Sequence, residues 1–167
     1  PPPDPERCQN PAGAPGAARR SHGARPLRLM LTYGGWRDAS FADQLPRLLE
    51  PAGIQCLRAR TGREVQSLID EGDVHIAVLD LTIPMEPGRT EPAGPRVLQL
   101  LRRCPSRPPT IVVRPRQGSV RANARGLAEA MREGAFTVLD DPVGIEAMLE
   151  TLRRLVRRHY PDHWTAA

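Results

Sequence analysis

The sequence contains no lysine, so all 24 of its Lys/Arg side chains are arginines. Aromatic residues make up only 4% of the chain, and proteins that bind single-stranded nucleic acid by base stacking usually need more. The net charge is +5, but the arginines are spread over most of the length. We therefore expect no nucleic-acid partner.

Cysteine is scarce, and long apolar runs are absent. The three cysteines, Cys8, Cys56 and Cys104, are far apart and form no Cys-x-x-Cys pair, which argues against a disulfide framework and a zinc site. No stretch approaches the ~18 consecutive apolar residues of a membrane span, and the N-terminus lacks an apolar export signal. We expect unpaired, reduced thiols in a cytoplasmic protein with no membrane contact.

The composition changes sharply near residue 26. Residues 1–26 are rich in Pro, Gly and Ala and hold too few large apolar groups to offset the entropy of ordering them, which predicts a disordered tail or linker. The chain opens on Pro1 and not on methionine, which is compatible with a fragment of a longer protein. We assign residues 27–160 to one domain and residues 161–167 to a C-terminal tail.

A short apolar run, Val74 to Leu79, ends abruptly at Asp80 and is followed by a proline at position 84. Its branched residues predict a strand buried on both faces, as in the centre of a parallel sheet. In open α/β sheets, ligands bind at the carboxyl ends of the strands, so Asp80 is a candidate functional residue. The simpler interpretation is that Asp80 begins a loop, as acids often do.

Further strands are predicted at residues 27–33, 54–59, 110–113 and 136–139, and helical patterns alternate with them. Five strands alternating with five helices indicate an α/β flavodoxin-like fold, a three-layer sandwich with a parallel sheet between helices.

Helix starts are predicted from capping residues. The first helix begins either at Ser40, which has Asp43 at capping-box spacing, or at Asp43 with Pro46 in its first turn. Thr61 with Glu64 caps the second helix, and Pro95 begins the third. Asp140 or Asp141 caps the last helix, with Pro142 just inside it.

Apolar spacing predicts which faces of the last two helices are buried. Ser119 starts a helix that would bury a face made by Val120, Ala124, Leu127, Ala128 and Met131. The last helix would bury the stripe Ile145, Met148, Leu149, Leu152, Leu155 and Val156. Its opposite side carries Arg153, Arg154, Arg157 and Arg158, which we interpret as a solvated face partly paired with Glu150.

The segment from Leu27 to Arg158 resembles the receiver domain of bacterial two-component response regulators. The resemblance is carried by Val78–Pro84, by Gly118–Val120 and by Ala130–Pro142, in the order and separation typical of the family. It implies a receiver-type signalling module that is not itself an enzyme, with Asp80 at the phospho-accepting position. It also implies a partner surface on the last two helices and the fifth strand, used by a protein partner or a homodimer.

The resemblance fails at the chemical site. Where receivers carry the acidic pair that holds Mg²⁺, this chain has Thr32 and Tyr33; the hydroxyl position falls at Pro115, or at Arg114 with a shift of one. The lysine position is Asp141, a charge that repels phosphate. We therefore expect a degenerate receiver without Mg²⁺ or another cofactor, acting through protein contacts and independently of phosphorylation.

Other interpretations remain open. Asp80 could be a working phospho-acceptor in a phosphorelay with a histidine kinase, although we favour a strand-end acid paired with Arg114 or Arg116. A flavodoxin-like cofactor-binding protein or enzyme is the second alternative, but Thr32–Gly35 is a poor phosphate-binding loop. His159 and His163 have the spacing of a helical metal pair, yet Pro161 between them should end the helix.

Overall fold

The computed structural model describes residues 25–32 and 40–164. A short 3₁₀ helix, η1 (Glu50–Ala52), follows the first helix. The other elements, in chain order, are β1 (Leu27–Thr32), α1 (Ser40–Leu49), β2 (Ile54–Ala59), α2 (Gly62–Asp70), β3 (Ile76–Asp80), α3 (Gly94–Arg103), β4 (Thr110–Pro115), α4 (Val120–Arg132), β5 (Ala135–Asp141), α5 (Ile145–His159) and α6 (Pro161–Trp164).

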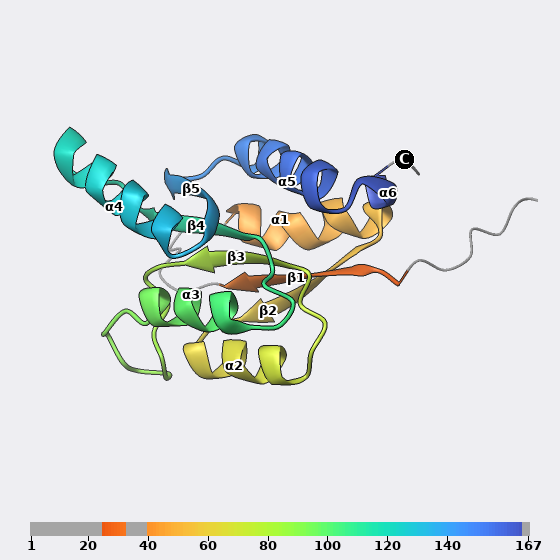
Figure 1. Ribbon diagram of the computed structural model, residues 1–167, viewed down its shortest axis with the longest axis horizontal. Coiled ribbons are helices and arrows are strands. Elements are labelled where there is room, and N and C mark those ends of the chain that lie inside the picture. The colour runs from red at the N-terminus through yellow and green to blue at the C-terminus, as the bar shows by residue number, and fades with distance from the viewer. Residues whose placement is uncertain (1–24, 33–39, 165–167) are drawn as a thin grey trace, which may run out of the picture.

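The five strands form one parallel sheet in the order β2-β1-β3-β4-β5, with helices on both faces (Figure 1). All five residues of the central strand β3 are buried, as the apolar run predicted. In the sheet register, Leu31 pairs with Val78 and Asp80 pairs with Val113. The carboxyl ends of β1, β3 and β4 therefore meet at one edge of the sheet, and Asp80 lies at its centre.

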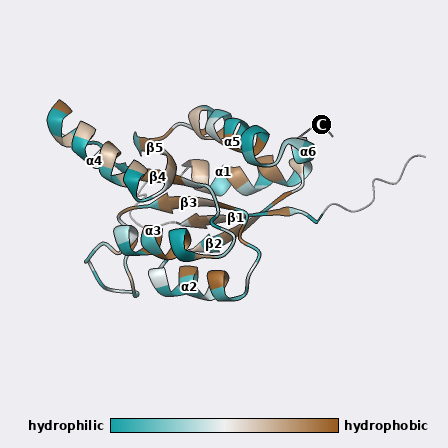
Figure 2. Cartoon of the chain, viewed as in Figure 1, coloured by the Kyte–Doolittle hydropathy of each residue, from teal (hydrophilic) through white to brown (hydrophobic). Residues whose placement is uncertain are grey.

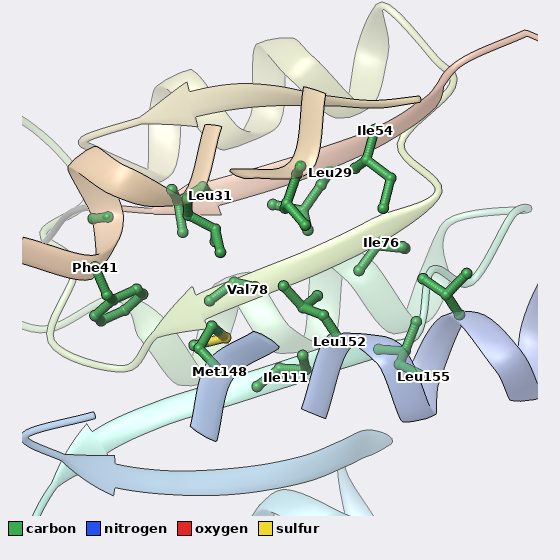
Figure 3. Packing of buried hydrophobic residues seen from close by; sticks show 14 of the residues in the cluster. Leu29, Leu31, Phe41, Ile54, Ile76, Val78, Ile111, Met148, Leu152 and Leu155 are labelled. Atoms are coloured by element: carbon green, nitrogen blue, oxygen red, sulfur yellow. The ribbon is translucent and has the colours of Figure 1, made fainter. Parts of the chain in front are cut away.

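One hydrophobic core lies between the sheet and the helices α1 and α5. Figure 3 shows Leu29, Val78 and Ile111 of three neighbouring strands facing Met148 and Leu152 of α5. The predicted stripe of α5 supplies this layer: Met148, Leu152, Leu155 and Val156 are fully buried, and Ile145 and Leu149 pack against the cluster. Since the stripe follows the 3.6-residue period of a helix, its prediction is confirmed.

A second core lies on the opposite face, under α2 and α3. Val65 of α2 and Val97 and Leu101 of α3 pack on Met30 and Leu79 of the sheet. Figure 2 shows the result: the strands are largely hydrophobic, and the helices around them alternate between hydrophobic and hydrophilic residues.

The predicted starts of two helices can be checked directly. Thr61 caps α2, because its side chain accepts a hydrogen bond from the Glu64 N–H at 3.2 Å. The alternative start of α1 at Asp43 is wrong: the helix begins at Ser40 and keeps Pro46 in its interior. Phe41 and Ala42 are buried, so the first turn contributes to the core and helps to offset the hydrogen bond that Pro46 removes.

The cap predicted for the last helix is wrong. β5 continues through Asp140 and Asp141, which pair with Arg114 and Pro115 of β4, so both acids belong to the sheet. The helix α5 begins only at Ile145, after Gly144, and Pro142 therefore precedes it.

The chain end adds a sixth α-helix to the five expected. α5 ends at His159, as predicted from Pro161, but Pro161 then begins α6 inside the segment expected to be a tail. Tyr160 donates a hydrogen bond to the His75 carbonyl at 2.7 Å, and a ring nitrogen of His163 lies 3.0 Å from the Ala52 carbonyl. These contacts fasten the end of the chain to the amino-terminal side of the sheet. His159 instead contacts the ring of Phe136, so the two histidines have different neighbours.

The prediction of which face of α4 is buried is wrong. Val120 is 88% exposed, and Leu127 and Met131 are exposed as well; within α4 the buried residue is Ala130. Figure 1 shows α4 projecting outward at one end of the molecule. The helix forms and begins at Ser119 as predicted, since Ser119 accepts a hydrogen bond from the Ala122 N–H at 3.2 Å, but it turns another side toward the sheet.

In the portions of the chain that the structure describes, no helix combines the length and the apolar character needed to cross a bilayer. Cys56 and Cys104 are free thiols, and Cys8 lies outside the described residues.

Candidate functional site

The candidate site lies at the edge of the sheet formed by the carboxyl ends of the parallel strands. Thr32 ends β1, Asp80 ends β3, Arg114 lies near the end of β4 and Asp141 ends β5. The sheet thus brings together four of the positions that the resemblance singles out. Tyr33, the remaining position of the expected acidic pair, lies outside the described residues.

Asp80 is 1% exposed, and its two carboxylate oxygens differ in their hydrogen bonding. Oδ1 accepts hydrogen bonds from the backbone N–H and the hydroxyl of Thr82, both at 2.8 Å. Oδ2 is buried and has no hydrogen-bond partner among the described residues. Burial raises the pKa of Asp80; the bonds from Thr82 oppose this shift, and the negative charge of Asp141 adds to it.

The expectation that Asp80 pairs with Arg114 or Arg116 is wrong: Oδ1 is bonded to Thr82, Oδ2 has no partner among the described residues, and Arg114 pairs with Asp140. Asp80 and Arg114 lie at or near the ends of neighbouring strands, but Arg114 lies directly opposite Asp140 in the β4–β5 ladder. A guanidinium group bonds most readily to the carboxylate that the register places beside it.

Thr32 has a structural role in this arrangement. Its fully buried hydroxyl accepts a hydrogen bond from the Asp80 N–H at 2.8 Å and donates one to the Val78 carbonyl at 3.3 Å. The side chain therefore ties the end of β1 to the end of β3. It brings no negative charge to the position where a receiver would place an acid.

Arg114 is the cation of the site, and it is 5% exposed. Its Nε donates to Asp140 Oδ1 at 2.8 Å, and Nη2 donates to the Asn123 carbonyl at 3.2 Å and to the Asn123 side-chain oxygen. Pro115, the other candidate for the hydroxyl position, is exposed. Arg114 therefore links β4, β5 and the first turn of α4 through hydrogen bonds.

Gly126 makes room for this arginine under α4. A Cβ atom at position 126 would lie 2.5 Å from Nη1 of Arg114, closer than non-bonded atoms approach. The guanidinium group thus occupies the space where the apolar face of α4 was expected to lie, which explains why Leu127 and Met131 remain exposed.

Sequence reasoning missed the cluster of Arg114, Asp140, Asn123 and Gly126. One signal could have suggested it: Arg114 directly follows the predicted strand 110–113, and Asp140 directly follows the predicted strand 136–139. Their strands are neighbours, and a buried arginine needs a carboxylate partner.

The described residues offer few ligands for Mg²⁺, the metal that the resemblance to receivers implies. A Mg²⁺ site uses near-octahedral oxygen ligands at short distances, usually one or two carboxylates together with waters and substrate phosphates. Only Asp80 Oδ2 is an unengaged buried carboxylate oxygen here, and no group of three or more His, Cys, Asp or Glu side chains that could hold a metal is found in residues 25–32 and 40–164. Asp141 is exposed at the end of β5.

No protein-family model matches the chain, and no curated protein matches it. Solved structures do match. A CheY-like response regulator receiver domain from Methanospirillum hungatei JF-1 aligns with a TM-score of 0.62 and 18% identity over 81% of this chain and 97% of that chain. The receiver domain of the Francisella response regulator 1452 aligns with a TM-score of 0.60 and 21% identity over 78% of this chain and 97% of that chain.

A longer protein, NtrX from Brucella abortus, aligns with a TM-score of 0.62 and 14% identity over 81% of this chain but 28% of its own length. The matched region is thus one part of a larger chain in that case. Together these similarities show that this chain has the fold of response-regulator receiver domains, which confirms the predicted flavodoxin-like architecture.

Proposed function

We propose that this chain is a response-regulator-type signalling module that acts through protein contacts and needs no phosphorylation. The observation that carries the proposal is the bonding of Arg114. In a receiver, the phosphoryl group attracts the hydroxyl residue and the lysine and thereby changes the surface around the fourth helix. Here Arg114 holds α4 through Asn123 and the sheet edge through Asp140, so the link between the sheet and α4 is made by side chains of the protein itself.

The electrostatics of the site support this proposal. A phosphorylated Asp80 would carry about two negative charges beside Asp141, in a buried position. The positive charge of Arg114 is offset by Asp140 at 2.8 Å, and the chain contains no lysine that could neutralise the phosphoryl oxygens. Phosphoryl transfer depends on such charges, since positioning and charge stabilisation supply nearly all of its catalysis.

A working acceptor is the second candidate, and one observation favours it. Oδ2 of Asp80 has no partner among the described residues, so it is the oxygen that could attack a phosphodonor. In that case a histidine kinase would be the physiological donor, and ligands from outside the described residues would have to hold Mg²⁺.

Intact-mass spectrometry separates the two candidates. The protein is incubated with Mg²⁺ and acetyl phosphate or phosphoramidate, beside Asp80→Asn and a receiver domain that has the complete acidic pair. We expect a phosphoryl adduct on that receiver alone. An adduct on this chain that is absent from Asp80→Asn would overturn the phosphorylation-independent proposal.

The exposed apolar face of α4 supports a contact surface on this side of the molecule. Val120, Leu127 and Met131 lie within about 40° of one another around the helix. Their exposed fractions are 88%, 43% and 47%, and most of the neighbouring strand β5 is half-buried. Exposed large apolar side chains grouped in this way are typical of protein–protein contacts. We propose that α4, β5 and α5 together contact another protein chain, which is a second copy in the simplest case.

Sedimentation velocity tests the homodimer. Met131→Arg places a charge on the apolar face, and Glu129→Arg is the matched control because it lies about 160° away around the same helix. We expect the dimer to dissociate in Met131→Arg and to persist in Glu129→Arg. A wild-type chain that sediments as a monomer at high concentration would rule out the homodimer.

A further inference from the structure

A groove of about 690 Å³ lies between α3 and α4 and opens beside the loop that follows β3. Leu81, Pro95, Leu98 and Ala130 give it an apolar lining. It forms because α4 rests on the guanidinium group of Arg114 and projects away from the molecule (Figure 1). The volume is within the range of small-molecule sites, about 300–1,000 Å³.

Arg114 supplies a buried hydrogen-bond donor at the wall of this groove, although Asp140 offsets its charge. Nε and Nη2 are hydrogen-bonded to Asp140 and Asn123, whereas Nη1 makes no hydrogen bond to the described residues. Nη1 lies against Gly126, which has no side chain to cover it and which also lines the groove. A guanidinium group that is 5% exposed thus keeps one nitrogen available for a ligand.

Charge is distributed unevenly along the groove. Arg125 directly precedes Gly126 and also lines the groove, whereas Glu129 follows about 6 Å further along the axis of α4 and Glu133 lies just after the end of this helix. Leu98 and Ala130 add apolar surface to the groove. This pattern suits a ligand with a negative head near Arg114 and an apolar body beyond it.

We propose that the groove between α3 and α4 binds a small amphipathic anion, whose carboxylate accepts a hydrogen bond from Nη1 of Arg114 and whose apolar body lies against Leu98 and Ala130. A hydrogen bond between a guanidinium and a carboxylate is about twice as strong as one between neutral groups. Water screens it weakly here, because the arginine is buried. This site is separate from the exposed face of α4 that carries Leu127 and Met131.

The test uses two probes with the same apolar body and opposite head charge, octanoate and octylammonium. Titrations of the full chain are followed by NMR chemical shifts below the micelle threshold of each probe. We expect octanoate to bind at least tenfold more tightly than octylammonium, with the largest shifts at Leu98, Gly126 and Ala130. Equal affinities, or no binding of octanoate, would overturn the proposal.

Paired variants test the location. Ala122 and Ala124 are both exposed, but Ala122 lines the groove and Ala124 lies about 160° away around the same helix, so Ala122→Trp fills the groove and Ala124→Trp does not. We expect Ala122→Trp to abolish octanoate binding and Ala124→Trp to retain it. Arg114→Met should remove the preference for octanoate over octylammonium. If both tryptophan variants bind octanoate equally, the groove is not the site, and this conclusion does not depend on whether Arg114→Met folds.

Discussion

Replacement of Asp80 by Asn should stabilise this protein at neutral pH. Asn retains an oxygen at Oδ1, which accepts the two hydrogen bonds from Thr82, and replaces the charged, unpartnered Oδ2 by a neutral amide group. An unsatisfied buried polar atom costs about 1–3 kcal/mol, and a charged one costs more than a neutral one. We expect a net gain of about 1 kcal/mol in the free energy of unfolding, or roughly 2–4 °C in Tm.

The pH dependence identifies the cause. Burial raises the pKa of Asp80 above its ordinary value of 3.8. At any pH between 3.8 and the raised pKa, the folded protein therefore binds more protons than the unfolded chain. The stability contributed by this carboxyl is therefore complete below pH 3.8 and is lost as the pH rises through the raised pKa. The advantage of Asp80→Asn should be small in acid and should grow across that interval.

Urea unfolding of both proteins from acid to neutral pH measures this difference, because the other titrating groups cancel. Asp73→Asn is the matched control: Asp73 is exposed and has a positive φ of 67°, a conformation that Asn also tolerates. A loss of stability in Asp80→Asn at pH 7, or a gain that does not change with pH, would refute the assignment of Oδ2 as an unpartnered buried charge.

Two further predictions concern the arginine and a buried thiol. Asp140→Ala should cost about 3 kcal/mol of unfolding free energy in urea titrations, because it leaves the buried Arg114 without its carboxylate, and Arg114→Met in the same chain should restore much of the loss. If the double variant were as unstable as the sum of the single losses, the pair would not be coupled. Burial raises the pKa of Cys56 to about 11, against the opposing charge of Arg58, so little thiolate is present at pH 8. Peptide mass spectrometry should find native Cys56 alkylated by iodoacetamide at least roughly tenfold more slowly than in urea, and equal rates would contradict this assignment.

Local patterns predicted most of the architecture correctly because each depends on neighbours in the sequence. The branched run before Asp80 became the buried central strand, and the stripe from Ile145 to Val156 became the buried face of α5. Thr61 caps its helix as expected. Apolar periodicity and capping hydrogen bonds are properties of a few consecutive turns, so distant residues alter them little.

The error at α4 shows where this reasoning stops. Helical spacing correctly predicted that Val120, Leu127 and Met131 share one face, but not what that face meets. Arg114 occupies the space under the helix, and this arrangement depends on Gly126, Asn123 and Asp140, which are 9 to 26 residues away from Arg114. A pattern of apolar residues carries no information about a polar group inserted from another strand.

By itself, the sequence determined the alternation of strands and helices, the position of Asp80 at a strand end and the absence of lysine from the chain. Only the tertiary structure decided which charges are partners. The sheet register places Arg114 opposite Asp140. Asp80 is hydrogen-bonded to Thr82 instead, and its Oδ2 has no partner among the described residues. Pairing between buried charges depends on distances of a few ångströms across neighbouring strands, and those distances exist only after the sheet has formed.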